Sequence, residues 1–257
     1  MRMLEARALT KNYSGIPAVK DVSFTVQPGQ VLGYLGPNGS GKSTTVKMLT
    51  GLVEPTRGEI LYRGESIRNC LVEYKRAVGY IPEEANLYSH LTGWEYLELV
   101  GLLRDMEPGM LKRRVERFLT LFSLFQHRQT VVSSYSKGMR QRLLLSAALL
   151  HDPQILIFDE PEAGLDVTTA LVLRNLISSL ASEGKVVLYC SHVLEVVEKV
   201  CTHVLLLHKG NVVAYESIQA VRNLASVPSL EHVFSELTDR TDTEEVAGGL
   251  VEAMRLQ

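Results

Sequence analysis

The sequence has few cysteines and no long apolar run. Its three cysteines, Cys70, Cys190 and Cys201, are too few and too scattered for a disulfide framework or a zinc site, and they fit a reducing compartment. The longest apolar stretch, residues 143–150, is far shorter than the roughly 18 residues that cross a bilayer. The charged N-terminal segment is unlike a signal peptide. We therefore expect a cytosolic chain that does not cross a membrane by itself.

The sequence also lacks a strong excess of either charge. Lys and Arg number 27 and Asp and Glu number 29, which gives a net charge of −2 over 257 residues. This balance argues against a surface that coats nucleic acid, so no nucleic-acid partner is expected. Hydrophobic residues make up 46% of the chain, enough for a sizeable core in one large domain or two small ones.

Short apolar runs alternate with helical patterns at both ends of the chain. Between residues 92 and 150 the apolar residues recur at helical spacing, which predicts an all-helical insertion. Strand–helix alternation on both sides of such an insertion indicates an α/β domain with a mainly parallel sheet. Strands are expected at residues 4–9, 22–26, 30–35, 59–62, 78–81, 155–158, 186–190, 204–207 and 212–215, and helices at 42–49, 168–180 and 193–200.

A glycine-rich loop follows the third predicted strand. Residues 36–43 read Gly-Pro-Asn-Gly-Ser-Gly-Lys-Ser and fit the spacing G-x-x-x-x-G-K-[ST] of a phosphate-binding loop. Glycines let successive backbone N–H groups point at one anion, and the next helix adds the partial positive charge of its N-terminus. Lys42 would reach the β- and γ-phosphates and the Ser43 hydroxyl would ligate Mg²⁺. A chance glycine-rich turn is disfavoured because strand, loop and helix are in register. The expected ATP contacts here are Gly36, Pro37, Asn38, Gly39, Ser40, Gly41, Lys42, Ser43 and Thr44.

Two carboxylates, Asp159 and Glu160, end another apolar strand. A buried strand tolerates charge where it emerges at the carboxyl edge of the sheet, which is where ligands bind in open α/β folds. Asp159 can hold Mg²⁺ through water, and Glu160 can act as a general base on the attacking water. An exposed acidic turn is the alternative, and the nearby phosphate-binding loop makes it less favoured.

Several further motifs resemble those of ABC-type ATPases. Residues 135–143, Tyr-Ser-Lys-Gly-Met-Arg-Gln-Arg-Leu, resemble the signature motif LSGGQ and precede the acidic strand, as in that family. Residues 163–166, Ala-Gly-Leu-Asp, resemble the D-loop, and Ser191-His192 resembles the switch histidine. Tyr13 lies where the family has an aromatic residue that stacks on adenine.

This resemblance implies a P-loop NTPase fold. The expected structure is a RecA-like core with a mainly parallel sheet, an antiparallel β edge and an all-helical signature subdomain. The implied boundaries are a cassette at 1–217, made of a core at 1–85 and 151–217 and a helical subdomain at 86–150, followed by a small helical appendage at 218–257.

The resemblance also implies an ATP sandwich between two subunits, a homodimer or a pseudo-dimer. Ser136 and Gly138 of one subunit would face the ATP in the loop of the other, and Asp166 would contact the partner across the interface. His192 would touch the γ-phosphate and hold Glu160 and the water in line. Glu160 and His192 are therefore the expected catalytic residues.

The sequence departs from the family pattern at three positions. Glu83 stands where the family usually has a glutamine that contacts Mg²⁺ and faces the membrane partner. Lys137 replaces the first glycine of the signature and Met139 replaces its glutamine. The phosphate-facing pair, Ser136 and Gly138, is retained, so nucleotide binding is still expected. The implied metal ligands are Ser43, Glu83 and Asp159.

The implied function is ATP hydrolysis that drives a membrane transporter. Tyr-Ser-Lys-Gly-Met, together with Pro-Glu-Glu in the loop before the helical insertion, is similar to ATPase subunits of ABC-2-type exporters, and so is the segment 229–237. The cofactors would be ATP and Mg²⁺, and the partners a transmembrane permease on a separate chain and a second ATP-binding subunit. The chain would then lie on the inner face of the cell membrane through the permease. The alternative is a soluble ABC-type ATPase that remodels nucleic acid or ribosomes, but the chain has one cassette and no CxxC pair.

Overall fold

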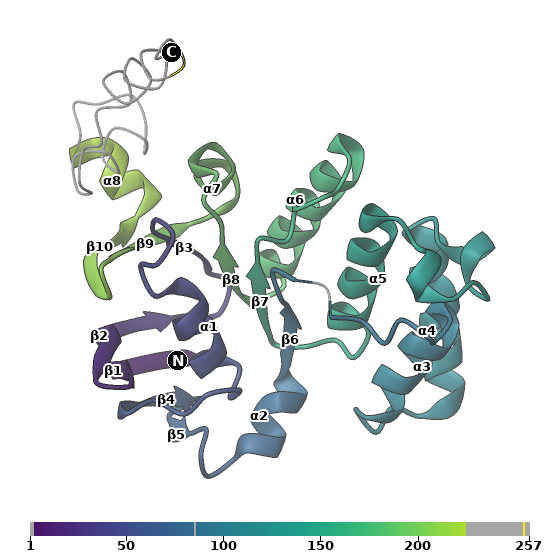
Figure 1. The fold of residues 1–257 in the computed structure, drawn as a ribbon, viewed down its shortest axis with the longest axis horizontal. Coiled ribbons are helices and arrows are strands. Elements are labelled where there is room, and N and C mark those ends of the chain that lie inside the picture. Colours follow the sequence, from purple (N-terminus) through teal and green to yellow (C-terminus); the bar gives the residue numbers. More distant parts are fainter. Residues whose placement is uncertain (1–2, 85, 225–253, 255–257) are drawn as a thin grey trace.

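The computed structural model describes residues 3–84, 86–224 and 254, and contains two sheets, helices that cover them and a separate group of helices (Figure 1). The strands are β1 Leu4–Tyr13, β2 Ile16–Val26, β3 Val31–Leu35, β4 Arg57–Tyr62, β5 Glu65–Ser66, β6 Val78–Ile81, β7 Ile155–Asp159, β8 Val186–Cys190, β9 His203–His208 and β10 Asn211–Ser217. The helices are α1 Lys42–Leu49, α2 Leu71–Ala77, α3 Gly93–Leu102, α4 Pro108–Leu121, α5 Lys137–Leu149, α6 Val167–Ser182, α7 Leu194–Val200 and α8 Ile218–Leu224. The segment 229–237 and most of the expected appendage at 218–257 lie outside the described residues.

The larger sheet has six strands in the order β10-β9-β3-β8-β7-β6. All neighbouring strands from β9 to β6 are parallel, and β10 pairs with β9 in the antiparallel direction. Every residue of β3, β7 and β8 is buried, because packed layers cover both faces of the sheet. This explains why these strands read as continuous apolar runs.

A second, antiparallel sheet has the order β2-β1-β4-β5. β2 begins at Ile16, earlier than the expected start at residue 22, because Ser14 and Gly15 form a tight turn with positive φ angles of 48° and 84°. Asn12 then pairs with Pro17, next to this turn. The antiparallel pairing therefore forms a whole sheet, in addition to the antiparallel strand at the edge of the larger one.

The two faces of the six-stranded sheet bury different helices. Leu32, Tyr34 and Cys190 pack with α1 and the antiparallel sheet in one core. The alternate residues Val31 and Tyr189 face a second core that contains α6 and α7 and the described helix α8, which adds Ile218 and Val221. The result is a layered core with the parallel sheet in the middle.

Helices α3 and α4 form a group at one side of the molecule and join the core through α5 (Figure 1). α5 contributes Leu145 and Leu149 to the core of the sheet, and Leu143 and Ala147 to the core of the helical group. The helices between β6 and β7 agree with the predicted helical subdomain. No helix within the described residues is long and apolar enough to cross a membrane.

Candidate functional site

Three neighbouring parallel strands, β3, β8 and β7, end at one edge of the sheet and carry the candidate site. Tyr34 pairs with Cys190, and Cys190 pairs with Asp159, so the segments that follow these strands emerge side by side. Those segments are the glycine-rich loop, Ser191-His192 and the acidic turn at Glu160. The structure thus places these three segments together at the carboxyl edge of the sheet, where ligands bind in open α/β folds.

The glycine-rich loop turns directly into α1. Gly41 precedes the helix with a φ of 106°, and a Cβ atom there would lie 2.5 Å from the carbonyl oxygen of Ala18, so only glycine fits. No side chain caps the N-terminus of α1, and its first turn holds no acidic residue. In contrast, Ser136 caps α5 and Asp166 caps α6. The first N–H groups of α1 therefore face the loop, where an anion would satisfy them.

Lys42 closes the loop on itself. Its Nζ donates to the carbonyl oxygens of Gly36 at 2.5 Å and Pro37 at 3.2 Å. Ser40, 2% exposed, points into the protein, and its Oγ has no hydrogen-bond partner among the described residues. A nucleotide phosphate would offer the ammonium group a stronger, charged acceptor than these two carbonyls.

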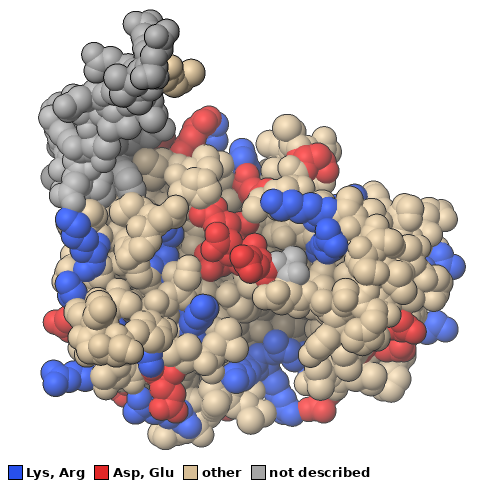
Figure 2. Space-filling model, viewed as in Figure 1, with Lys and Arg blue, Asp and Glu red and all other residues tan. Residues whose placement is uncertain are grey.

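A cavity of about 530 Å³ opens between the loop and the acidic turn. Twelve of its thirteen lining residues belong to the predicted site, and the thirteenth is Ala18 of β2. It is lined by Ala18, Gly36, Pro37, Asn38, Gly39, Gly41, Lys42, Ser43, Thr44, Glu83, Asp159, Glu160 and His192. Among these residues one lysine faces three carboxylates. Figure 2 shows acidic side chains gathered at the centre of this face, with basic side chains around them.

Asp159 is the most buried carboxylate of the cavity, at 5% exposed. Burial raises the pKa of its carboxyl to about 6, and the nearby Glu83 and Glu160 add to this rise. Lys42 and Lys47 oppose it. A divalent cation at this position would relieve the repulsion, and carboxylate and hydroxyl oxygens, here Asp159 and Ser43, are donors that Mg²⁺ accepts.

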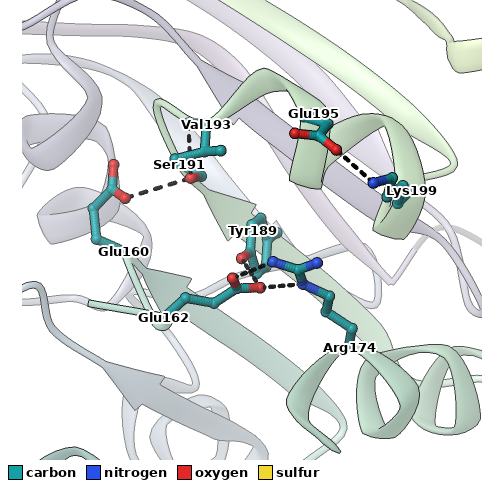
Figure 3. Close-up of polar contacts among 8 residues, drawn as sticks. All are labelled: Glu160, Glu162, Arg174, Tyr189, Ser191, Val193, Glu195 and Lys199. Carbon is teal, nitrogen blue, oxygen red and sulfur yellow. Dashed lines mark hydrogen bonds and ion pairs between the residues drawn. The ribbon is translucent and has the colours of Figure 1, made fainter. Parts of the chain in front are cut away.

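Glu160 is held by the ends of two strands. Its N–H donates to the carbonyl oxygen of Cys190 at 3.0 Å, and its backbone has a φ of 49°. Its Oε1 lies 2.7 Å from His192 Nδ1. Ser191 Oγ donates to its Oε2 at 3.4 Å (Figure 3). Ser191 was not predicted as a site residue, although its position directly before His192 could have indicated it.

Glu83 lines the same cavity, and its charge helps to raise the pKa of Asp159. It also lines a neighbouring notch with Glu84, Lys137, Arg140 and Gln141, where the end of β6 meets the start of α5. Glu83 therefore connects the cavity to the helical group.

Five predicted nucleotide contacts do not line the cavity: the buried Ser40 and four residues outside the loop. Tyr13 is 46% exposed at the end of β1, where Lys11 Nζ lies 5.4 Å from the centre of its ring. Ser136 Oγ accepts from Met139 N at 3.2 Å, and Gly138 follows on the first turn of α5. Asp166 accepts from Thr169 N at 2.9 Å, and this bond lowers the pKa of its carboxyl. Their nucleotide contacts stay predictions.

Comparison with known proteins decides the family. The family described as ABC transporter matches residues 19–163, more than half of the chain, including the glycine-rich loop, the signature segment and both carboxylates. The chain belongs to the ABC transporter family. The ATP-binding protein NatA of Bacillus subtilis (strain 168) is 34% identical over 220 residues, which cover 85% of this chain and 89% of NatA.

Two further relatives of this ABC protein bear on its activity. The bacitracin transport ATP-binding protein BcrA of Enterococcus faecalis is 36% identical over 212 residues, 82% of this chain and 68% of BcrA. A dimeric post-hydrolysis structure of the ATP-binding cassette MJ0796, bound to ADP and Pi, matches with a TM-score of 0.77 and 26% identity over 84% of this chain and 99% of that one. The chain is an ATP-hydrolysing subunit that powers a membrane transporter. Remodelling of nucleic acid or ribosomes is not supported.

Proposed function

We propose that the cavity binds ATP with Mg²⁺ and that Glu160 and His192 perform the hydrolysis. The observation that carries this proposal is the 2.7 Å contact between His192 Nδ1 and Glu160 Oε1 at the mouth of a cavity that also holds Lys42 and Asp159. Glu160 takes a proton from water, the water oxygen attacks the γ-phosphorus, and the bond to the bridging oxygen breaks to leave ADP and phosphate. His192 fixes one carboxylate oxygen and leaves Nε2 for a phosphate oxygen.

The donor set of the cavity fits Mg²⁺ with few protein ligands. No three His, Cys, Asp or Glu side chains within the described residues form a metal site by themselves. Mg²⁺ commonly uses one or two protein oxygens and completes its shell with phosphates and water. Ser43 and Asp159 would hold it, with Glu83 in the same cavity, and it would neutralise the charge that develops on the phosphates.

The site is completed by a second copy of the chain. Ser136, Gly138 and Asp166 lie outside the cavity at the N-termini of α5 and α6, where a second molecule can reach them. The dimeric state of the related cassette supports this arrangement. ATP would then lie between Lys42 of one protomer and Ser136 and Gly138 of its partner, with Tyr13 against adenine.

The transport partner is a permease on a separate chain, and the direction is export, as in ABC-2-type systems. The similarity to the bacitracin transport protein supports a role in transport. The chain would work on the cytoplasmic face of the cell membrane through that permease. Isolation of the complex from membranes, followed by identification of the bound membrane subunit, tests this assignment.

Two carboxylate substitutions test the roles in the cavity. Glu160→Gln removes the base and keeps the shape of the side chain, so kcat should fall by about a hundredfold or more while ATP still binds. Glu83→Gln is the matched control, because Glu83 lies in the same cavity without a contact to His192, and it should retain measurable ATPase activity. Equal losses in the two variants would mean that the carboxylates are misassigned.

A further inference from the structure

A second carboxylate, Glu162, lies two residues after Glu160 and points to different partners (Figure 3). Arg174 of α6 donates to both of its oxygens, from Nε at 2.8 Å and from Nη2 at 2.7 Å. The hydroxyl of Tyr189 on β8 donates to Oε1 at 3.0 Å. The Glu162 side chain is only 19% exposed and Tyr189 is 1% exposed. Glu162, Arg174 and Tyr189 are called the anchor cluster below.

The anchor cluster joins three segments that each lead to a residue of the proposed site. Glu162 lies in the turn that runs from Glu160 to Asp166. Arg174 lies on the helix that begins after Asp166, and Tyr189 lies on the strand that leads into Ser191 and His192. The cluster therefore fixes the turn against both neighbouring elements.

Glu160 needs such support because its backbone is strained. A φ of 49° is in the left-handed region, which costs a residue with a side chain about 1–3 kcal/mol unless the surroundings enforce it. The backbone of this turn is also held to neighbouring segments by single hydrogen bonds. Glu160 N–H donates to Cys190 O at 3.0 Å, and Gln141 Nε2 donates to Pro161 O at 2.9 Å. The two-pronged Arg174–Glu162 pair is the best-defined charged contact of the turn.

The protonation states of Arg174 and Tyr189 keep both side chains as hydrogen-bond donors to Glu162. The hydrogen bond from Arg174 to Glu162 raises the pKa of the guanidinium, which stays charged. Burial, and then the charge of Glu162, raise the pKa of the Tyr189 hydroxyl, which therefore remains a donor. Breaking the Arg174–Glu162 pair is unfavourable, because removal of one partner leaves a partly buried charge without compensation.

We propose that the anchor cluster is a positioning device for Glu160. It holds the turn so that the Glu160 carboxylate meets His192, and it acts on the chemical step more than on ATP binding. This inference rests on the proposed role of Glu160 as the base.

The test compares kcat, KM for ATP and the melting temperature of full-length variants with MgATP. Glu162→Gln should lower kcat by about tenfold or more and change KM by less than about twofold, since a small displacement of a base costs rate and leaves phosphate contacts intact. Arg174→Gln should also lower kcat. Arg174→Lys keeps the positive charge but not the two parallel hydrogen bonds, so its kcat should fall less than that of Arg174→Gln. Tyr189→Phe should show a smaller loss. If Glu162→Gln does not fold, Arg174→Lys and Tyr189→Phe carry the same comparison.

Glu195→Gln is the matched control. Glu195 pairs with Lys199 at 2.6 Å on the neighbouring helix α7, and both side chains are more than half exposed (Figure 3). Its loss should leave kcat unchanged. A purely structural anchor cluster would lower the melting temperature and leave kcat of the folded protein at the wild-type value, which would overturn the inference.

The double variant Glu160→Gln/Glu162→Gln separates this inference from the proposed function. If the cluster acts through Glu160, Glu162→Gln should cause little further loss in the Glu160→Gln protein. The same fold-loss in both backgrounds would overturn the inference alone. Hydrolysis at the wild-type rate by the single Glu160→Gln variant would overturn the role of Glu160 and the inference with it.

Discussion

The charged side chains of the loop cavity are not balanced within the chain. Glu83, Asp159 and Glu160 face Lys42 among the residues that line it, and Lys42 bonds to carbonyl oxygens of its own loop. Burial raises the pKa of Asp159, and the neighbouring charges of Glu83 and Glu160 add to this rise. A nucleotide and a cation would give both kinds of charge a partner.

Lys42→Ala should weaken ATP binding and nearly abolish turnover. The ammonium group is the cavity's positive charge toward the phosphates, and no other lining side chain replaces it. The fold should survive because the side chain lies in an open loop. Nucleotide titration and ATPase assays check this, with Lys112→Ala on the exposed face of α4 as the control. Undiminished hydrolysis by folded Lys42→Ala protein would show that the site is elsewhere.

Asp159 should make the nucleotide-free protein less stable as the pH rises from about 4 to about 6. The folded-state pKa of about 6 exceeds the ordinary value of 3.8, so the folded chain binds more protons than the unfolded chain in this window. Ionised Asp159 then costs up to about 3 kcal/mol above pH 6. Asp159→Asn should therefore stabilise the protein at pH 8, and the difference should vanish near pH 4. Chemical denaturation at both pH values measures the difference in free energy of unfolding between the variant and the wild type. A difference that does not change with pH would refute the electrostatic cause.

At the scale of elements, the sequence allowed prediction wherever a local pattern determined the structure. The strand–loop–helix from Val31 to Leu49 and the buried strand β7 were predicted because apolar runs and glycine spacing are local signals. α2 was not predicted because it buries only Tyr74 and has no apolar stripe. The early start of β2 depends on pairing with β1, which is not visible in a single segment.

The candidate site shows the same division. Lys42, Asp159, Glu160 and His192 were predicted from their motifs, and the structure brings them to one cavity. Ala18 was missed because it comes from the other sheet. The anchor-cluster partners Arg174 and Tyr189 were missed because only the folded chain brings them to Glu162.

Helix α8 contributes buried apolar side chains to the core of the larger sheet. Ile218 and Val221 are buried against the second face of the sheet. A chain that ends after Leu224 keeps this helix and should retain ATP binding. Removal of residues 218–257 should cost about 2–4 kcal/mol more, from the burial of two aliphatic side chains. Denaturation midpoints of the two truncated chains check this. Loss of ATP binding by a folded chain that ends at Ser217 would contradict the cassette boundary at residue 217.

At the scale of the whole molecule, the residues of the proposed site divide into two surfaces. One surface holds the cavity at the carboxyl edge of the sheet, and the other holds Ser136, Gly138 and Asp166 at the starts of α5 and α6. A single chain leaves the cavity open to solvent on its acidic side. Two copies placed head to tail would enclose each nucleotide between both surfaces, and their acidic edges would repel each other when no nucleotide is bound.

Light scattering of Glu160→Gln protein with MgATP tests this account most directly. The substitution keeps the shape of the site, removes one repelling charge and slows hydrolysis, so an ATP-bound dimer should accumulate. Without nucleotide the same protein should be mostly monomeric. Ser136→Arg in the same background is the control, since it blocks the opposing surface at the cost of a helix cap worth about 1 kcal/mol, and it should prevent the dimer. A Glu160→Gln protein that stays monomeric with ATP bound, beside a wild type that hydrolyses ATP as a monomer, would contradict the sandwich.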